Sequence, residues 1–347
     1  MGISGFSVFP PLAQSPSPMT DLAGTLSFHL HRDERGLCLD VTSTRPPAAR
    51  ILRGMTGAQA VALVPNLFSL CGRAQGLAAQ LAWEAAHAGT EAVPTFHPAV
   101  AAEAAVEHLW RLWVDWPQQL GLPAHLPLLA VWRRRLMADA GALSSPEFRA
   151  LLGGEGLGAA DVDALCQRLP NLATANPPPP LPTLSAQQWL EAMPVPDESF
   201  ACRPHWQGAA AETGAAARLT ALGHALPDAP LARRLIARRR ELDLLADGEN
   251  SNATVGYASA VSPAPGVGLA AVETARGLLL HAVRADGERV ADWIIVAPTE
   301  WNFRPGGPFC QLAEQVAYDR NAVTTTLPLL VLALDPCVPH RFLEANS

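Results

Sequence analysis

Two segments of this 347-residue sequence carry side chains suited to bind a metal ion. Near the C-terminus, Cys337 follows Asp335 and Pro336, and His340 comes three residues later. Because the proline fixes its own backbone and keeps Asp335 out of helical geometry, we expect Cys337 on a defined turn. A thiolate and an imidazole suit iron, nickel, zinc or copper, and a tight turn would let both reach one ion. The spacing is also typical of a buried cysteine beside an ordinary loop histidine.

The second segment holds Cys71, and a third segment holds a candidate anion-binding residue, Arg276. Cys71 precedes Gly72 at the expected start of a helix, where the helix dipole lowers the pKa of a thiol. Arg276 precedes a glycine at the mouth of an expected strand, and its guanidinium could offer several donors to an anion. Each also fits a purely structural role, as a small core cysteine and as a surface arginine.

The composition limits the class of protein. Apolar residues make up 49% and charged residues 16% of the chain, which indicates a globular protein and excludes a disordered one. The net charge of −7 gives no indication of nucleic-acid binding. No apolar stretch reaches the roughly 20 residues that span a bilayer, so we expect no membrane insertion. The six cysteines are scattered without a CxxC pair, which predicts a reduced, cytoplasmic protein.

The hydrophobic pattern predicts a mainly α protein with small antiparallel β hairpins, an α+β fold. We expect one hairpin within residues 24–42 and another within 276–298, with no β-α-β alternation. A single domain over 1–347 is expected, with a proline-rich connector at 171–184 and a candidate flexible N-terminus at 1–20. The predicted helices cover 57–88 with a break at Pro65, 99–116, 128–140, 159–168, 209–221 and 231–246.

Taken in order along the chain, these segments resemble the large subunit of nickel-iron hydrogenases. Residues 273–281, ETARGLLLH, match the family's E-x-x-R-G-x-L-x-H, and residues 298–302, PTEWN, match P-T-T-W-N with one change. Residues 335–343 align with D-P-C-x-x-C-x-x-H, and residues 68–75 align with C-G-x-C-x-x-A-H. Residues 208–219 resemble a further family segment, G-x-x-x-E-x-G-x-x-A-R. The resemblance spans about residues 20–343 and implies the large-subunit fold, reduced in size.

The departures from this family bear on function. Its members hold nickel with four cysteines, two of which bridge to an iron that carries cyanide and carbon monoxide. The corresponding positions here are Phe68, Cys71, Cys337 and His340. Losing two thiolates is expected to abolish the four-sulfur site, so we expect no nickel. Two histidines of the family motifs are replaced as well, by Gln75 and Leu343.

The pattern resembles the HupK/HoxV group of hydrogenase accessory proteins. That resemblance implies a non-catalytic maturation scaffold that carries or helps assemble an Fe(CN)2(CO) unit, for delivery to the hydrogenase large subunit. It also implies other maturation proteins, of the HypC and HypD kind, as partners. In this interpretation Cys71 and Cys337 bind the iron, His340 is an alternative ligand and Arg276 contacts the cyanides. Cys310 is an outlying candidate ligand that more simply packs in a helix.

Two other functions stay open at this point. The chain could be a divergent, active hydrogenase, in which case the pure protein would bind nickel and use hydrogen to reduce a dye. It could also be a metal-free structural homologue that occupies the docking position of the large subunit.

Overall fold

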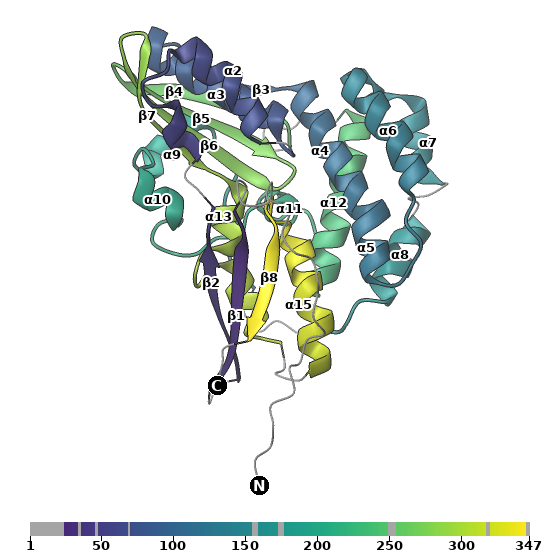
Figure 1. The fold of residues 1–347 in the computed structure, drawn as a ribbon. Coiled ribbons are helices and arrows are strands. Elements are labelled where there is room, and N and C mark those ends of the chain that lie inside the picture. The colour runs from purple at the N-terminus through teal and green to yellow at the C-terminus, as the bar shows by residue number, and fades with distance from the viewer. Residues whose placement is uncertain are drawn as a thin grey trace.

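Two β sheets and a layer of helices make up the architecture (Figure 1). The computed structural model describes residues 24–33, 36–45, 48–68, 70–154, 159–172, 177–248, 255–316 and 320–344. The larger sheet is antiparallel and has the strand order β3-β4-β5-β6-β7. Its strands are β3 (Ala92–Phe96), β4 (Tyr257–Ala264), β5 (Val267–Thr274), β6 (Gly277–Asp286) and β7 (Arg289–Val296).

Helices cover both faces of the larger sheet. α2 (Gly57–Leu67) and α3 (Gly72–Ala88) lie on one face, and α9 (Ala186–Ala192) and α10 (Glu198–Cys202) lie on the other (Figure 1). α3 lies so close to β5 that a Cβ atom added at Gly268 would be only 2.0 Å from the carbonyl oxygen of Ala82. Only a glycine at this position leaves room for the helix. The buried side of α3 consists largely of small residues, namely Ala74, Ala78, Ala79, Ala82, Ala85 and Ala86.

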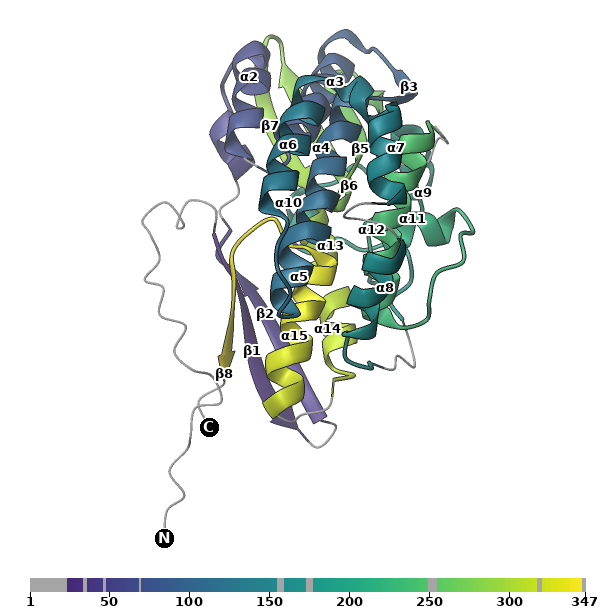
Figure 2. The same ribbon diagram turned by 90° about the vertical axis from the view of Figure 1, so that its right-hand side faces the viewer.

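A layer of helices packs beside the sheet (Figures 1 and 2). It contains α4 (Pro98–Trp110), α5 (Trp116–Gln119), α6 (Leu126–Ala138), α7 (Pro146–Gly153), α8 (Ala159–Gln167), α12 (Pro230–Asp247) and α15 (Arg320–Leu334). A π-helical turn, Arg111–Asp115, joins α4 to α5. Such turns are rare and often lie at functional sites, and this one directs Arg111 toward Asp335.

The smaller sheet joins the two ends of the described chain. β1 (Leu26–Asp33) pairs antiparallel with β2 (Gly36–Ser43) and parallel with β8 (His340–Glu344). The ring of Phe28 in β1 packs on Phe342 in β8 and on Phe309 in α14 (Pro308–Ala313). The turn that carries Cys337 is therefore held between the end of α15 and the start of β8.

The structure confirms both predicted hairpins and extends them. β3, β4 and β5 widen the second hairpin into a five-stranded sheet, and β8 adds a parallel partner to the first. The sequence predicted that the helix over 57–88 breaks at Pro65, and this position is wrong by two residues. α2 contains the proline and ends at Leu67. Across the described ranges, no helix combines the length and the apolar character needed to cross a bilayer.

The predicted helix over 209–221 is shorter than expected. α11 (Ala215–Ala221) begins only after Gly214, whose φ of +123° suits glycine alone. The residues before it run extended, and Glu212 pairs with Pro180 in an isolated parallel bridge. The described part of the proline-rich connector, residues 177–184, thus runs beside this segment.

Candidate functional site

Cys71 is the N-cap residue of α3, at the edge of the helical layer. The expectation that the helix dipole lowers its pKa is wrong. Burial, followed by the charge of Cys337, raises the pKa of the Cys71 thiol to about 12. Two of the first backbone N–H groups of this helix also have a side-chain acceptor, since Glu103 of α4 accepts hydrogen bonds from the backbone nitrogens of Arg73 (2.8 Å) and Ala74 (3.1 Å).

Cys337 is fixed by the segment that matches the P-T-T-W-N element. The hydroxyl of Thr299, in α13 (Pro298–Phe303), donates to the Cys337 sulfur over 3.1 Å and accepts from the Cys337 backbone N–H over 3.0 Å. Asp335, two residues earlier, has a φ of +56°, which turns the chain sharply at the end of α15. We call Cys71 and Cys337, whose sulfur atoms interact electrostatically, the thiol pair.

A cluster of arginines surrounds the buried carboxylate of Asp335. Arg111 approaches its Oδ1 atom to 2.7 Å, Arg276 approaches the same atom to 3.3 Å, and Arg238 lies 3.4 Å from Oδ2. Burial would raise the pKa of Asp335, but these three cations outweigh it and hold the pKa well below its usual range. We call Arg111, Arg238 and Arg276 the arginine cluster.

Arg276 connects the arginine cluster to the thiol pair. It lies on the two-residue turn between β5 and β6, and its Nη2 atom also contacts Glu107 of α4 at 2.6 Å. Burial opposes its charge, yet Asp335, Glu107 and the two cysteines together raise its pKa. The guanidinium is therefore charged, held from two sides and directed toward the region of the two sulfur atoms.

Arg45 is a second cation beside the thiol pair, and no spacing signal in the sequence marks it. It follows β2, forms a 2.7 Å ion pair with Glu300, and lies 5.7 Å from the ring centroid of Phe68. Burial opposes its charge, but Glu300 and both cysteines outweigh that effect and raise its pKa. The thiol pair is thus flanked by Arg276, from the larger sheet, and by Arg45, from the end of a strand in the smaller sheet.

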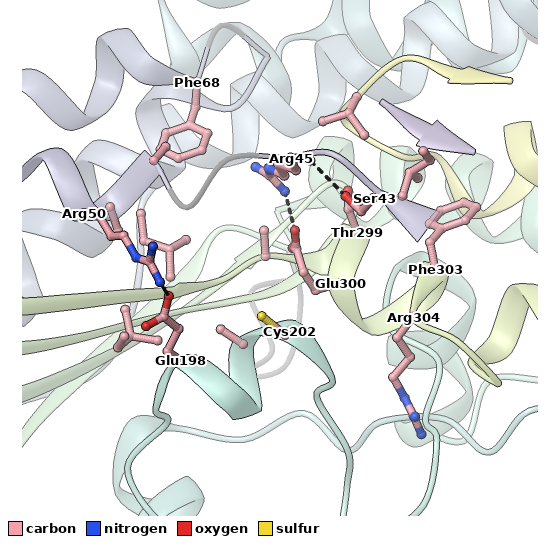
Figure 3. Close-up of a pocket in the computed structure, with 18 of the residues that line it drawn as sticks. Ser43, Arg45, Arg50, Phe68, Glu198, Cys202, Thr299, Glu300, Phe303 and Arg304 are labelled. Carbon is pink, nitrogen blue, oxygen red and sulfur yellow. Dashed lines mark hydrogen bonds and ion pairs between the residues drawn. The ribbon is translucent and has the colours of Figure 1, made fainter. Parts of the chain in front are cut away.

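Cavities of very different size adjoin these residues. An apolar cavity of about 520 Å³ is bounded by Arg45, Phe68, Thr299 and Glu300, and Figure 3 shows the Arg45–Glu300 pair on its wall. A cavity of about 10 Å³, enough for one water molecule, lies between Cys71, Glu107 and Arg276.

His340 packs with aromatic rings, and Cys310 lies in a short helix. His340 begins β8, is exposed, and has its ring 6.1 Å from the rings of Phe28 and Phe342. Cys310 is buried in α14. Among the residues that the structure describes, no three or more His, Cys, Asp and Glu side chains form a group that could hold a metal ion. The metal-ligand assignment of Cys71, Cys337 and His340 stays a prediction.

The arrangement offers two neighbouring thiols and two guanidiniums. Thiolates are soft ligands that suit iron, and guanidiniums donate to anionic or polar groups. Phe68, at the first of the four ligand positions of the family motifs, has a ring that cannot ligate a metal. The donor set therefore fits a small metal unit that carries hydrogen-bond acceptors, bound by two sulfur atoms.

Curated relatives match nearly the whole chain, although no model of a known protein family matches it. The chain is 33% identical to the hydrogenase expression/formation protein HoxV of Cupriavidus necator, covering 94% of this chain and 97% of that protein. It is also 33% identical to the hydrogenase expression/formation protein HupK of Rhizobium leguminosarum, covering 91% of this chain and 95% of that protein.

Solved structures show the same fold. The [NiFeSe] hydrogenase of Desulfovibrio vulgaris Hildenborough has a TM-score of 0.58 at 14% identity, over 91% of this chain and 99% of that chain. The Ni-Fe-Se hydrogenase of Desulfomicrobium baculatum has a TM-score of 0.56 at 13% identity, over 92% and 98%. The fold is that of a nickel-iron hydrogenase large subunit, reduced in size, as the sequence predicted.

Proposed function

Because this chain belongs to the HoxV/HupK family of hydrogenase expression/formation proteins, we propose that it is a non-catalytic scaffold for hydrogenase maturation. Its cargo is the Fe(CN)2(CO) unit, which it holds or helps to complete before delivery to the hydrogenase large subunit. The observation that supports this proposal best is the thiol pair, placed beside Arg276 and Arg45 in a large-subunit fold.

The roles of these residues follow from their chemistry. Cys71 and Cys337 supply the sulfur ligands, since thiolates bind iron well. Arg276 offers N–H groups to the cyanide nitrogens, and its contacts with Asp335 and Glu107 keep it oriented when cargo arrives. Arg45 offers a second set of donors from the other side.

A transient cargo must also be released. Two thiolates carry less negative charge than four and bind a cation less tightly. The thiol of Cys71 must also lose its proton before it can ligate, and its raised pKa weakens binding further. The cavity of about 10 Å³ between Cys71 and Arg276 has no room for the cargo, so loading requires the surrounding side chains to move.

The partners in this proposal are maturation proteins of the HypC and HypD kind, which supply the unit, and the hydrogenase large subunit, which receives it. The proposed location is the cytoplasm, where thiols stay reduced.

Infrared spectroscopy tests the proposal directly. Protein purified without oxygen after co-expression with its maturation partners should show cyanide and carbonyl stretching bands. Cys71→Ser and Cys337→Ser should lose these bands, whereas Cys166→Ser, a half-buried cysteine on α8, should keep them. His340→Ala should also keep them if the two sulfurs suffice. Bands that persist in both serine variants would show that the ligand assignment is wrong.

Two other results would replace the proposal. Absence of bands in the wild-type protein, under conditions that load its partners, would favour a metal-free structural homologue. Hydrogen-dependent dye reduction by the pure protein with bound nickel would favour a divergent hydrogenase.

A further inference from the structure

The apolar cavity of about 520 Å³ is large enough to hold a small molecule. Its wall includes Leu26 of β1, from the smaller sheet, and Trp293 of β7, from the larger sheet. Arg50 and Glu198 also line it, and they form an ion pair whose side chains are about half exposed (Figure 3). The cavity therefore reaches the surface beside this ion pair.

Thr299 links this cavity to the thiol pair. It lines the cavity, and its hydroxyl donates to the Cys337 sulfur over 3.1 Å. Val338, the residue after Cys337, lines the cavity as well. Phe68 is a further lining residue, and Cys71, three residues later, borders the cavity of about 10 Å³. Both cysteine-bearing segments therefore contribute to the wall of the larger cavity.

Three side chains lie beside Thr299 on this wall (Figure 3). Arg45 forms its 2.7 Å ion pair with Glu300, and its guanidinium lies 5.7 Å from the ring centroid of Phe68. The other carboxylate oxygen of Glu300, Oε2, is buried and has no hydrogen-bond partner among the described residues. A buried polar atom without a partner is unfavourable, so an opening that lets Oε2 meet water or a ligand recovers part of its own cost. We call Arg45, Phe68 and Glu300 the gate.

We propose that the larger cavity is the entry chamber of the cargo, which crosses it from the surface to the sulfur of Cys337 while the gate opens. The identity of what enters rests on the proposed function. The cavity beside Cys71 has room for one water molecule, whereas the larger cavity has room for the whole unit. The chemistry of the wall also fits a metal unit with diatomic ligands, because apolar side chains suit a carbonyl group and Arg45 can donate to cyanide nitrogens.

Cys202 is the position at which the chamber can be blocked. It is exposed on α10 and lines the cavity, so Cys202→Trp should fill part of the entrance without disturbing buried packing. The matched control is Arg203→Trp, which adds the same side chain at the next residue. Arg203 is also exposed, and it lies outside the cavity lining.

Two maleimides of different size measure access to Cys337 in the metal-free protein. N-phenylmaleimide and N-methylmaleimide react by the same chemistry, so the ratio of their rates at one pH cancels the fraction of thiolate and reports size alone. Cys202→Trp should lower this ratio about fivefold, since the larger reagent must displace the added side chain. Phe68→Ala removes part of the gate and should raise the ratio, and Arg203→Trp should not change it. Peptide mass spectrometry measures both rates, and an unchanged ratio in Cys202→Trp or in Phe68→Ala would overturn the proposal.

Infrared spectroscopy after co-expression tests whether the cargo itself uses this route. The cyanide and carbonyl bands should be severalfold weaker in Cys202→Trp than in wild type or Arg203→Trp. Bands of wild-type intensity in Cys202→Trp would overturn the proposal even if the maleimide ratio falls. The two proposals fail separately: wild-type protein without bands would refute the scaffold function, whereas an unchanged maleimide ratio would refute only the entry chamber.

Discussion

At the scale of single residues, the site combines groups that are costly to bury with partners that offset the cost. Asp335 is the central case, since one carboxylate that is 2% exposed contacts three arginines. The same contacts orient Arg276 beside the thiol pair. Charge balance and geometry therefore depend on the same side chains, and removing one partner affects both.

The binding of iron by Cys71 should become weaker as the pH falls. A thiol whose pKa is raised to about 12 is protonated throughout the neutral range, and a metal must displace that proton. The affinity for ferrous iron should therefore drop about tenfold per pH unit for each proton displaced. Anaerobic titrations between about pH 7 and pH 8 measure this slope. Cys71→Ser should reduce it, and an identical slope in that variant would contradict the expectation.

Replacing Asp335 should destabilise the protein strongly. Asp335→Asn leaves the arginine cluster without its shared counter-charge, and breaking a buried ion pair in this way costs about 3–5 kcal/mol of unfolding free energy. Urea denaturation measures the change. The matched control is Asp292→Asn, which breaks a partly exposed pair with Arg53 and should cost less than about 1 kcal/mol. Similar losses in both variants would refute the special role of Asp335.

At the scale of elements, α3 links the sheet to the site. It carries Cys71 at its N-cap, and it lies against β5 where Gly268 leaves room. The position of Cys71 therefore depends on how closely this helix approaches the sheet. Glu103 of α4 fixes the same end of α3 from the other side.

Adding one methyl group at Gly268 should disturb this packing. In Gly268→Ala the new Cβ would overlap the carbonyl oxygen of Ala82, so α3 must shift, at a cost of about 1–3 kcal/mol or more. The alkylation rate of Cys71 should change as well, since its helix moves. Gly153→Ala, in a helix with no atom within 4 Å of the added methyl, should be neutral or slightly stabilising. Denaturation and alkylation together test both expectations, and a neutral Gly268→Ala would contradict them.

At the scale of the whole molecule, the two ends of the described chain close the site together. β8 pairs in parallel with β1, so the turn bearing Cys337 is held by segments more than 300 residues apart in sequence. Arg341 adds a 3.0 Å hydrogen bond from its Nε atom to the hydroxyl of Ser27 across the same pair of strands. The last strand therefore positions the cysteine as well as covering Phe28.

Removal of β8 should loosen Cys337 more than Cys71. A chain that ends at Pro339 loses the pairing with β1 and exposes Phe28, so its melting temperature should fall by several degrees. Iodoacetamide should then modify Cys337 faster, while Cys71 on α3 changes little. A chain that ends at Glu344 keeps the whole strand and is the control. Equal alkylation rates of Cys337 in the two chains would show that β8 does not position it.

The sequence alone determined the local elements and the family. The spacing of apolar residues indicated both hairpins and most helices, and the ordered motifs around Cys71, Arg276 and Cys337 pointed to the large-subunit fold. These features depend on residues close together in the chain, where periodicity and turn chemistry act.

Only the tertiary structure decided the environment of those residues. It paired β8 with β1, placed Arg45 beside the thiol pair, set His340 among aromatic rings and raised the pKa of Cys71 where the helix dipole alone predicted a fall. Each of these depends on contacts between distant segments, and burial and charge at a site are sums over such contacts that no local pattern records.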